Sequence, residues 1–236
     1  MSVNNLLYTT SRGAAIRPMI EAEVPNCVFY TRGGATLEEL GQRAVNDLQW
    51  EIKPENCIVY FIAGLPSVTF RERDPNWGGL KYEEVIFNEP EDDAVARICN
   101  IIDSIAISVR SFKATPVFST IIPMSLRVWN DVRLSQGKTQ MLLHTGQYED
   151  MQYFLNRAIM RVNYHIITTN VDNLMGTPHL FDVVASYDGS PYTPRIHYNR
   201  FEDGVHLKPE YSMKCATKLK TAMFHNRRLL MNVLAA

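Results

Sequence analysis

Short apolar runs alternate with longer amphipathic segments along almost the whole chain. The most apolar run, over 56–63, has hydrophobic side chains at successive positions from Cys57 to Ala63. A strand covered on both faces shows this pattern, as the central strands of parallel sheets do. By the same reasoning we expect strands over 5–10, 26–30, 56–63 and 115–122.

The segments between these runs have the period of helices. In 37–50 apolar residues recur at helical spacing, at Leu37, Leu40, Ala44 and Leu48. The alternation of strand and helix, without a linker or internal repeat, predicts a single three-layer α/β/α domain over residues 1–236, with a mostly parallel sheet and helices on both faces. The expected helices are 14–23 (short or kinked at Pro18), 37–50, 91–112, 148–167 and 209–234.

Three further segments have no clear period. The segment 71–90 is rich in charge, glycine and aromatic residues such as Trp77, and we expect an irregular loop there that forms a lid or rim. The segment 123–135, with Trp129, is expected to be a loop or short helix. A third irregular stretch is expected over 177–203.

Composition adds limits on partners and location. The chain has 236 residues, 46% of them hydrophobic and 21% charged, and a net charge of −1, which implies no polyanionic partner. Its cysteines, Cys27, Cys57, Cys99 and Cys215, lack C-x-x-C spacing, so reduced thiols are expected and no zinc site. Neither a signal peptide nor an apolar run of about 18 residues is present, which predicts an intracellular, cytoplasmic protein without a membrane span.

The chemistry that stands out is an acid and a histidine in one turn, Asp203-Gly204-Val205-His206, directly before the last predicted helix. A Ser-His-Asp hydrolase needs such a pair, because the carboxylate fixes the histidine tautomer and stabilises the imidazolium. The alternative is plain structure, since Asp-Gly is common in turns and a Pro-Glu pair commonly begins a helix.

Other candidates follow the predicted strands. Ser11 comes directly after the first strand, where it is either a nucleophile or a helix N-cap. Gly33 and Gly34 open the second predicted helix, where backbone N–H groups suit an oxyanion, although a plain tight turn is the alternative. Gly64 ends the strongest strand. Ligands bind beyond the carboxyl ends of parallel strands, and all these positions fall at that edge.

Four sequence blocks together resemble the SGNH (GDSL-type) hydrolase family, whose fold is flavodoxin-like. The resemblance spans nearly the whole chain, and its sharpest match is the last block. The blocks are Thr9-Thr10-Ser11, Gly33-Gly34-Ala35-Thr36-Leu37, Gly64-Leu65-Pro66-Ser67 and Asp203-Gly204-Val205-His206-Leu207. The stretch from Thr177 to the Asp203 turn also resembles versions of this domain in retrotransposon-linked open reading frames of aquatic animals.

The resemblance implies a serine esterase or deacetylase acting on a small acyl ester, with no cofactor and no metal. In that reading Ser11 is the nucleophile, His206 the general base, and Asp203 the residue that orients His206. Backbone donors at Ser11, Gly34 and Gly64 would form the oxyanion hole.

Two departures from the family pattern keep a second hypothesis open. Thr9-Thr10 replaces the family's Gly-Asp, and Pro66 replaces an asparagine that donates to the oxyanion. Proline has no N–H, and losing one oxyanion donor typically costs about 10²–10³ in rate. The alternative is therefore a catalytically degenerate module that binds or assembles.

A third hypothesis is association with nucleic acid through the basic last helix. Its cations include Lys214, Lys218, Arg227 and Arg228. The structural alternative is a solvated face whose positive charges the helix dipole favours near the C-terminal end. The other histidines, His144, His165, His179, His197 and His225, show no ligand spacing, and we expect structural or surface roles for them.

Overall fold

The computed structural model describes residues 3–51, 53–73, 82–139, 142, 144–187 and 194–235. Its centre is a four-stranded, wholly parallel sheet with the strand order β2-β1-β3-β6. The strands are β1 (Asn4–Thr9), β2 (Cys27–Thr31), β3 (Cys57–Ile62) and β6 (Thr115–Phe118). All four strands were predicted, and β6 is the only one markedly shorter than expected.

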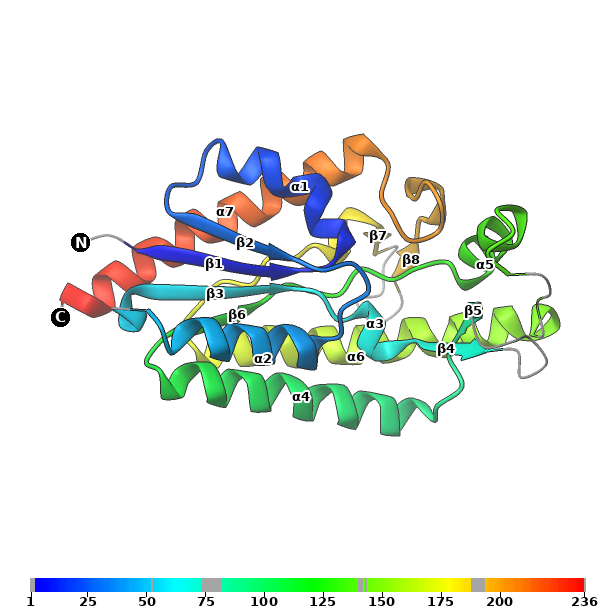
Figure 1. Cartoon of the computed structure of the whole chain (residues 1–236), viewed down its shortest axis with the longest axis horizontal. Coiled ribbons are helices and arrows are strands. Elements are labelled where there is room, and N and C mark those ends of the chain that lie inside the picture. Colours follow the sequence, from blue (N-terminus) through cyan, green and yellow to red (C-terminus); the bar gives the residue numbers. More distant parts are fainter. Residues whose placement is uncertain are drawn as a thin grey trace.

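Helices cover both faces of this sheet, as the alternating pattern predicted (Figure 1). The helices α2 (Leu37–Leu48), α4 (Glu91–Ser111) and α6 (Tyr148–Asp172) lie on one face, and α1 (Ser11–Glu21) and α7 (Pro209–Ala235) lie on the other. The strand β3 supplies both layers, because Val59 and Phe61 pack with the first group while Ile58 and Tyr60 pack with the second. The fold is therefore a three-layer α/β/α arrangement.

Local sequence explains where α2 begins. Thr36 and Glu39 form a capping box at the start of α2, since each side chain accepts the other residue's backbone N–H. The N–H of Leu37 also donates to Ser67 Oγ at 2.7 Å. Ser67 belongs to the short helix α3 (Leu65–Val68), so α2 and the segment after β3 are fixed to each other.

Four buried asparagine side chains bond to backbone groups in the way that a neighbouring strand would. Each side-chain amide accepts the N–H and donates to the C=O of one backbone residue, which satisfies polar groups that no neighbouring strand pairs. The pairs are Asn130 with Val85, Asn163 with Ile121, Asn170 with Phe118, and Asn226 with Gly176. Through Asn163 the chain beyond β6 stays fixed to α6 although the strand has ended.

The expectation of an irregular segment over 71–90 is wrong for 71–73 and 82–86. Strands β4 (Phe70–Arg73) and β5 (Tyr82–Ile86) pair as an antiparallel hairpin beyond the carboxyl end of the main sheet (Figure 1). Residues 74–81, with Trp77, lie outside the described residues. Sequence reasoning missed the hairpin because charged residues such as Glu84, which is fully buried, stand where an apolar alternation would mark a strand.

The remaining differences are shifted element ends and short elements within the segments expected to be irregular. The structure begins α1 at Ser11 instead of residue 14 and carries α6 five residues further, to Asp172. The segment 123–135 contains the helix α5 (Leu126–Ser135), and the 177–203 stretch contains two short strands, β7 (Ala185–Ser186) and β8 (Arg195–Ile196). Among the described residues, no helix combines the length and the apolar character that crossing a membrane requires.

Candidate active site

Three side chains predicted from distant parts of the sequence form one hydrogen-bonded row. Ser11 Oγ lies 3.1 Å from His206 Nε2, and His206 Nδ1 lies 2.7 Å from Asp203 Oδ2. With its proton on Nδ1, the imidazole donates to Asp203, and Nε2 accepts from the Ser11 hydroxyl. A serine hydrolase uses this order of groups.

The Asp203 carboxylate is anchored by its own turn. Its Oδ1 accepts the backbone N–H of Val205 at 3.0 Å and of His206 at 2.7 Å. Burial acts to raise the pKa of Asp203, but the hydrogen bonds from the His206 ring and from these two N–H groups outweigh it and hold the pKa below its ordinary value. The residue is therefore a carboxylate at neutral pH, fixed in position to orient His206.

Gly204 allows this turn to lie against the N-terminal end of α5. Its φ of +86° is in the left-handed region, and a Cβ there would lie 2.7 Å from Trp129 N and 2.9 Å from Ser125 O. The Ser125 N–H donates to Gly204 O at 2.8 Å, and the Trp129 indole meets the His206 ring edge-on. The helix α5 thus supports the turn that carries the histidine.

Ser11 is the first residue of α1, directly after β1, and is not its N-cap. Thr10 occupies the cap position and makes no side-chain capping bond. As a first-turn residue Ser11 has no intrahelical acceptor for its N–H. The N-cap interpretation of this serine is therefore wrong, and the Ser11 hydroxyl contacts the His206 ring.

The glycine turn after β2 lies beside Ser11. A Cβ on Gly33 would come within 3.9 Å of Ser11 Cβ, and Gly34 has a φ of +73°. A Cβ on Gly34 would lie 2.9 Å from Arg71 Nη2, so the bare backbone lets this arginine approach. This turn follows β2, the strand that pairs with β1, and so lies beside Ser11 at the end of β1.

Gly64 and Pro66 follow β3 but differ in their relation to the site. Pro66 lines the cavity in front of Ser11, whereas Gly64 is not among the described residues that line it. Gly64 has a φ of +121°, and a Cβ there would lie 2.6 Å from Ile121 Cδ1. Close packing against Ile121 and the positive φ account for a glycine at this position.

A cavity of about 600 Å³ opens over this row of residues. It lies where the four parallel strands end, on the side of Figure 1 to which the arrows of β1 and β3 point. Its lining includes Ser11, His206 and Trp129, and Arg71 and Val85 of the β4–β5 hairpin form part of its wall without filling it.

Arg12 is a residue that sequence reasoning missed. Its three guanidinium nitrogens donate to backbone carbonyls of Val205 at 2.9 Å, Ile122 at 2.5 Å and Pro123 at 2.8 Å. Burial lowers the pKa of Arg12 to about 10, so the group remains a cation at neutral pH. No local pattern marks an arginine whose partners lie over a hundred positions away in the sequence. Arg12 joins α1, which begins at Ser11, to the turn that carries His206.

Arg12→Met is expected to lower kcat by about 10–100-fold for any reaction that uses the Ser11–His206 contact and to leave KM nearly unchanged, because that contact loosens while the cavity persists. Arg12→Lys, which keeps the charge but only one donor nitrogen, should fall in between. Arg17→Met on the exposed side of α1 is the matched control and should behave as wild type. A rise in KM with unchanged kcat would contradict this positioning role.

The predicted basic face of α7 makes only scattered interactions. Lys218 Nζ lies 3.7 Å from Asp182 Oδ2, and Lys214 Nζ lies 4.9 Å above the Tyr211 ring. Neither contact points to a nucleic acid, and that role stays a prediction.

Comparison with known proteins places the fold. No family model and no curated protein matches the sequence. Among solved structures, the chain is similar to a lipolytic protein of the G-D-S-L family from Veillonella parvula at 9% identity, over 94% of this chain and 99% of that one, with a TM-score of 0.58. This is the SGNH (GDSL-type) hydrolase fold. A GDSL-like lipase from Bacteroides thetaiotaomicron matches at 14% identity, over 94% and 88% of the chains, with a TM-score of 0.57.

The acetyl xylan esterase AlAXEase is a third similar structure. It shares 11% identity over 92% of this chain and 98% of that one, with a TM-score of 0.53. At such identities the likeness concerns the SGNH fold alone, so the roles of individual residues rest on the geometry described above.

Proposed function

We propose that this chain is a serine hydrolase of the SGNH type that cleaves a small acyl ester, as an esterase or deacetylase. The observation that carries the proposal is the 3.1 Å contact between Ser11 Oγ and His206 Nε2, continued to Asp203 at 2.7 Å. The row opens into a cavity at the edge of the sheet where α/β proteins bind ligands. An SGNH hydrolase fold supplies the same setting.

In the proposed reaction Ser11 Oγ attacks the ester carbonyl carbon while His206 Nε2 takes the hydroxyl proton. The tetrahedral intermediate collapses, the bond to the leaving alkoxide breaks, and His206 returns the proton to that oxygen. Water then repeats the sequence on the acyl-Ser11 ester and releases the acid. Asp203 keeps His206 in the required tautomer and stabilises the imidazolium.

The oxyanion of the intermediate is proposed to rest on the N–H groups of Ser11 and Gly34. Ser11 N–H is a first-turn donor without an intrahelical acceptor, and the Gly33–Gly34 turn adjoins Ser11. Gly64, the third predicted donor, has less support, because it packs against Ile121 behind the cavity lining. Pro66, where the family has asparagine, donates nothing.

The cavity favours a mostly apolar acyl group. Its lining is largely apolar around the row, with Ile121, Ile122, Met124, Leu180 and Trp129, while Arg12, Arg71 and Glu39 bring charge to it. The similar structures include a lipase and an acetyl xylan esterase, and these names indicate different ester substrates. The proposal therefore does not specify the alcohol part of the ester that this chain cleaves.

The test is hydrolysis of p-nitrophenyl acetate by the purified chain beside its Ser11→Ala variant. The proposal expects release of p-nitrophenolate by the wild type that the variant lacks. Equal, background rates for both would favour the second candidate, a degenerate binding module. The observation behind that candidate is Pro66 at the cavity wall.

The other finer expectations belong to the same proposal. They are the extent of a single domain over 1–236, a likeness to the esterase-like domains linked to retrotransposons, and a cytoplasmic location.

A further inference from the structure

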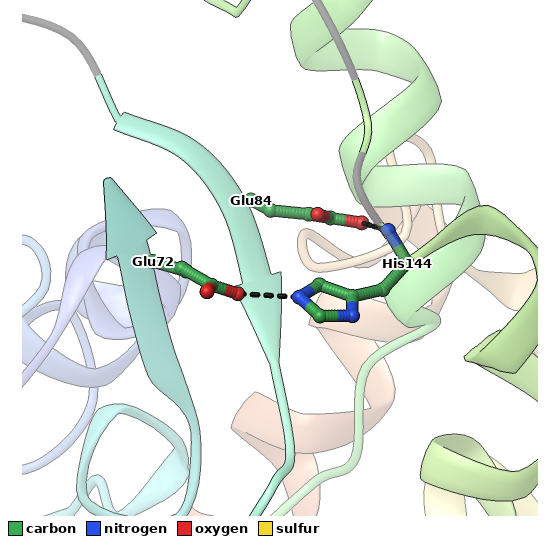
Figure 2. Close-up of side chains that lie close together, drawn as sticks. All are labelled: Glu72, Glu84 and His144. Atoms are coloured by element: carbon green, nitrogen blue, oxygen red, sulfur yellow. Dashed lines mark hydrogen bonds and ion pairs between the residues drawn. The ribbon is translucent and has the colours of Figure 1, made fainter. Parts of the chain in front are cut away.

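The β4–β5 hairpin has two chemically different faces. In its register Arg71 pairs with Val85, and Glu72 pairs with Glu84. Side chains alternate along a strand, so neighbouring pairs face opposite sides. Arg71 and Val85 line the cavity. Glu72 and Glu84 instead point toward His144, in the segment that leads into α6 (Figure 2).

These three side chains bring ligand atoms close together. One oxygen of each glutamate and one nitrogen of His144 all lie within 4.8 Å of one another. His144 Nε2 is 2.5 Å from Glu72 Oε2, and the backbone N–H of His144 donates to Glu84 Oε1 at 3.2 Å (Figure 2). The Tyr148 hydroxyl also donates to Glu84 Oε1. Residues from three elements thus converge on one point.

Carboxylates gather at this point. Those of Glu72 and Glu84 lie side by side, and Glu84 is fully buried. The Nδ1 of His144 is buried and has no hydrogen-bond partner among the described residues, while its Nε2 lies against the Glu72 carboxylate. Imidazole nitrogens are the commonest metal ligands in proteins.

We propose that Glu72, Glu84 and His144 bind one divalent transition-metal ion of the Zn²⁺ class. A set of two carboxylates and one imidazole suits such ions, whereas Ca²⁺ takes about six to eight oxygen ligands. The side chains of His144 and Glu72 are 24% and 39% exposed, so an ion can enter and water can complete its coordination. The ion replaces the hydrogen bond between Glu72 and His144.

The role of this ion is structural. Because the glutamates and the cavity-lining pair lie on opposite faces of the hairpin, the ion does not touch Ser11. It fixes the hairpin to the segment before α6 and so holds Arg71 and Val85 at the cavity wall. The sequence reasoning expected no metal ligands, since these residues stand 12 and 60 positions apart and meet only through the hairpin. The inference does not depend on the proposed esterase activity.

The test is titration of EDTA-treated, dialysed protein with Zn²⁺ in a calorimeter, beside Glu72→Gln and Glu84→Gln. We expect one ion per wild-type chain and a Kd raised at least about 10–100-fold in both variants. His165→Gln is the matched control, because His165 also contacts a carboxylate, Asp103 at 2.8 Å, but belongs to no such three-ligand group among the described residues. It should bind as wild type does.

Two results would overturn the site. One is the absence of stoichiometric Zn²⁺ binding by the wild type. The other is equal affinity in the wild type and the partly exposed Glu72→Gln variant, which is the variant less prone to misfold. Titration with Co²⁺ in place of Zn²⁺ tests whether the cysteines bind the ion. A thiolate ligand would give a charge-transfer absorption band, and the proposed site would give none.

Discussion

Ser11→Ala, His206→Ala and the double variant are expected to lower kcat/KM for p-nitrophenyl acetate by the same factor, about 10⁴-fold. The equality follows from the geometry. His206 Nε2 accepts from Ser11 Oγ at 3.1 Å, so the base has no proton to take once the hydroxyl is gone, and the hydroxyl is a weak nucleophile once the base is gone. Groups that act as one unit do not give additive losses.

The matched control is a second serine–histidine pair in the same chain. His197 Nε2 lies 2.9 Å from Ser186 Oγ, and neither residue lines the cavity among the described residues. His197→Ala should keep wild-type activity. Additive losses in the Ser11 and His206 variants, or a loss in the His197 variant of the same size, would contradict a single Ser11–His206 unit.

Pro66→Asn is expected to raise kcat by about 10–100-fold, a part of the roughly 10²–10³ that one oxyanion donor contributes in other hydrolases. Pro66 is the second residue of α3 and lines the cavity, so an asparagine side chain there reaches the space in front of Ser11. An added amide donor should act on the transition state and leave KM largely unchanged.

The control for this gain is Pro66→Ala. Alanine restores the backbone N–H and removes the ring but supplies no side-chain donor, so its kcat should stay near that of the wild type. Equal rates for the alanine and asparagine variants would show that the side chain at this position does not reach the oxyanion.

Elements defined by a short-range pattern could be predicted from the sequence. The strand β3 has apolar residues at every position, and α2 has helical spacing with a capping box, so both were found with small errors at their ends. The hairpin β4–β5 was missed because the buried Glu84 has its hydrogen-bond donors far away in the sequence. They are the Tyr148 hydroxyl, 64 positions away, and the His144 N–H, 60 positions away. Long-range compensation of a buried charge leaves no local signal.

The candidate site divides in the same way. The Asp203–His206 turn is a local motif, and its contact with Ser11 follows from the rule that parallel strands present their carboxyl ends at one edge. Arg12 and the Asn163–Ile121 pair help to position the same site, but their partners are backbone groups. Every residue has these groups, so the sequence does not show which of them are the partners. Such residues become visible only when the fold brings their partners together.

The measurement that tests the central claim most directly is mass spectrometry of the purified chain after reaction with a fluorophosphonate, which modifies activated serines covalently. The account predicts one adduct per chain, located on Ser11, formed slowly in His206→Ala and absent in Ser11→Ala. Absence of an adduct in the wild type, or an adduct on Ser119 or Ser212, which also line the cavity, would contradict it.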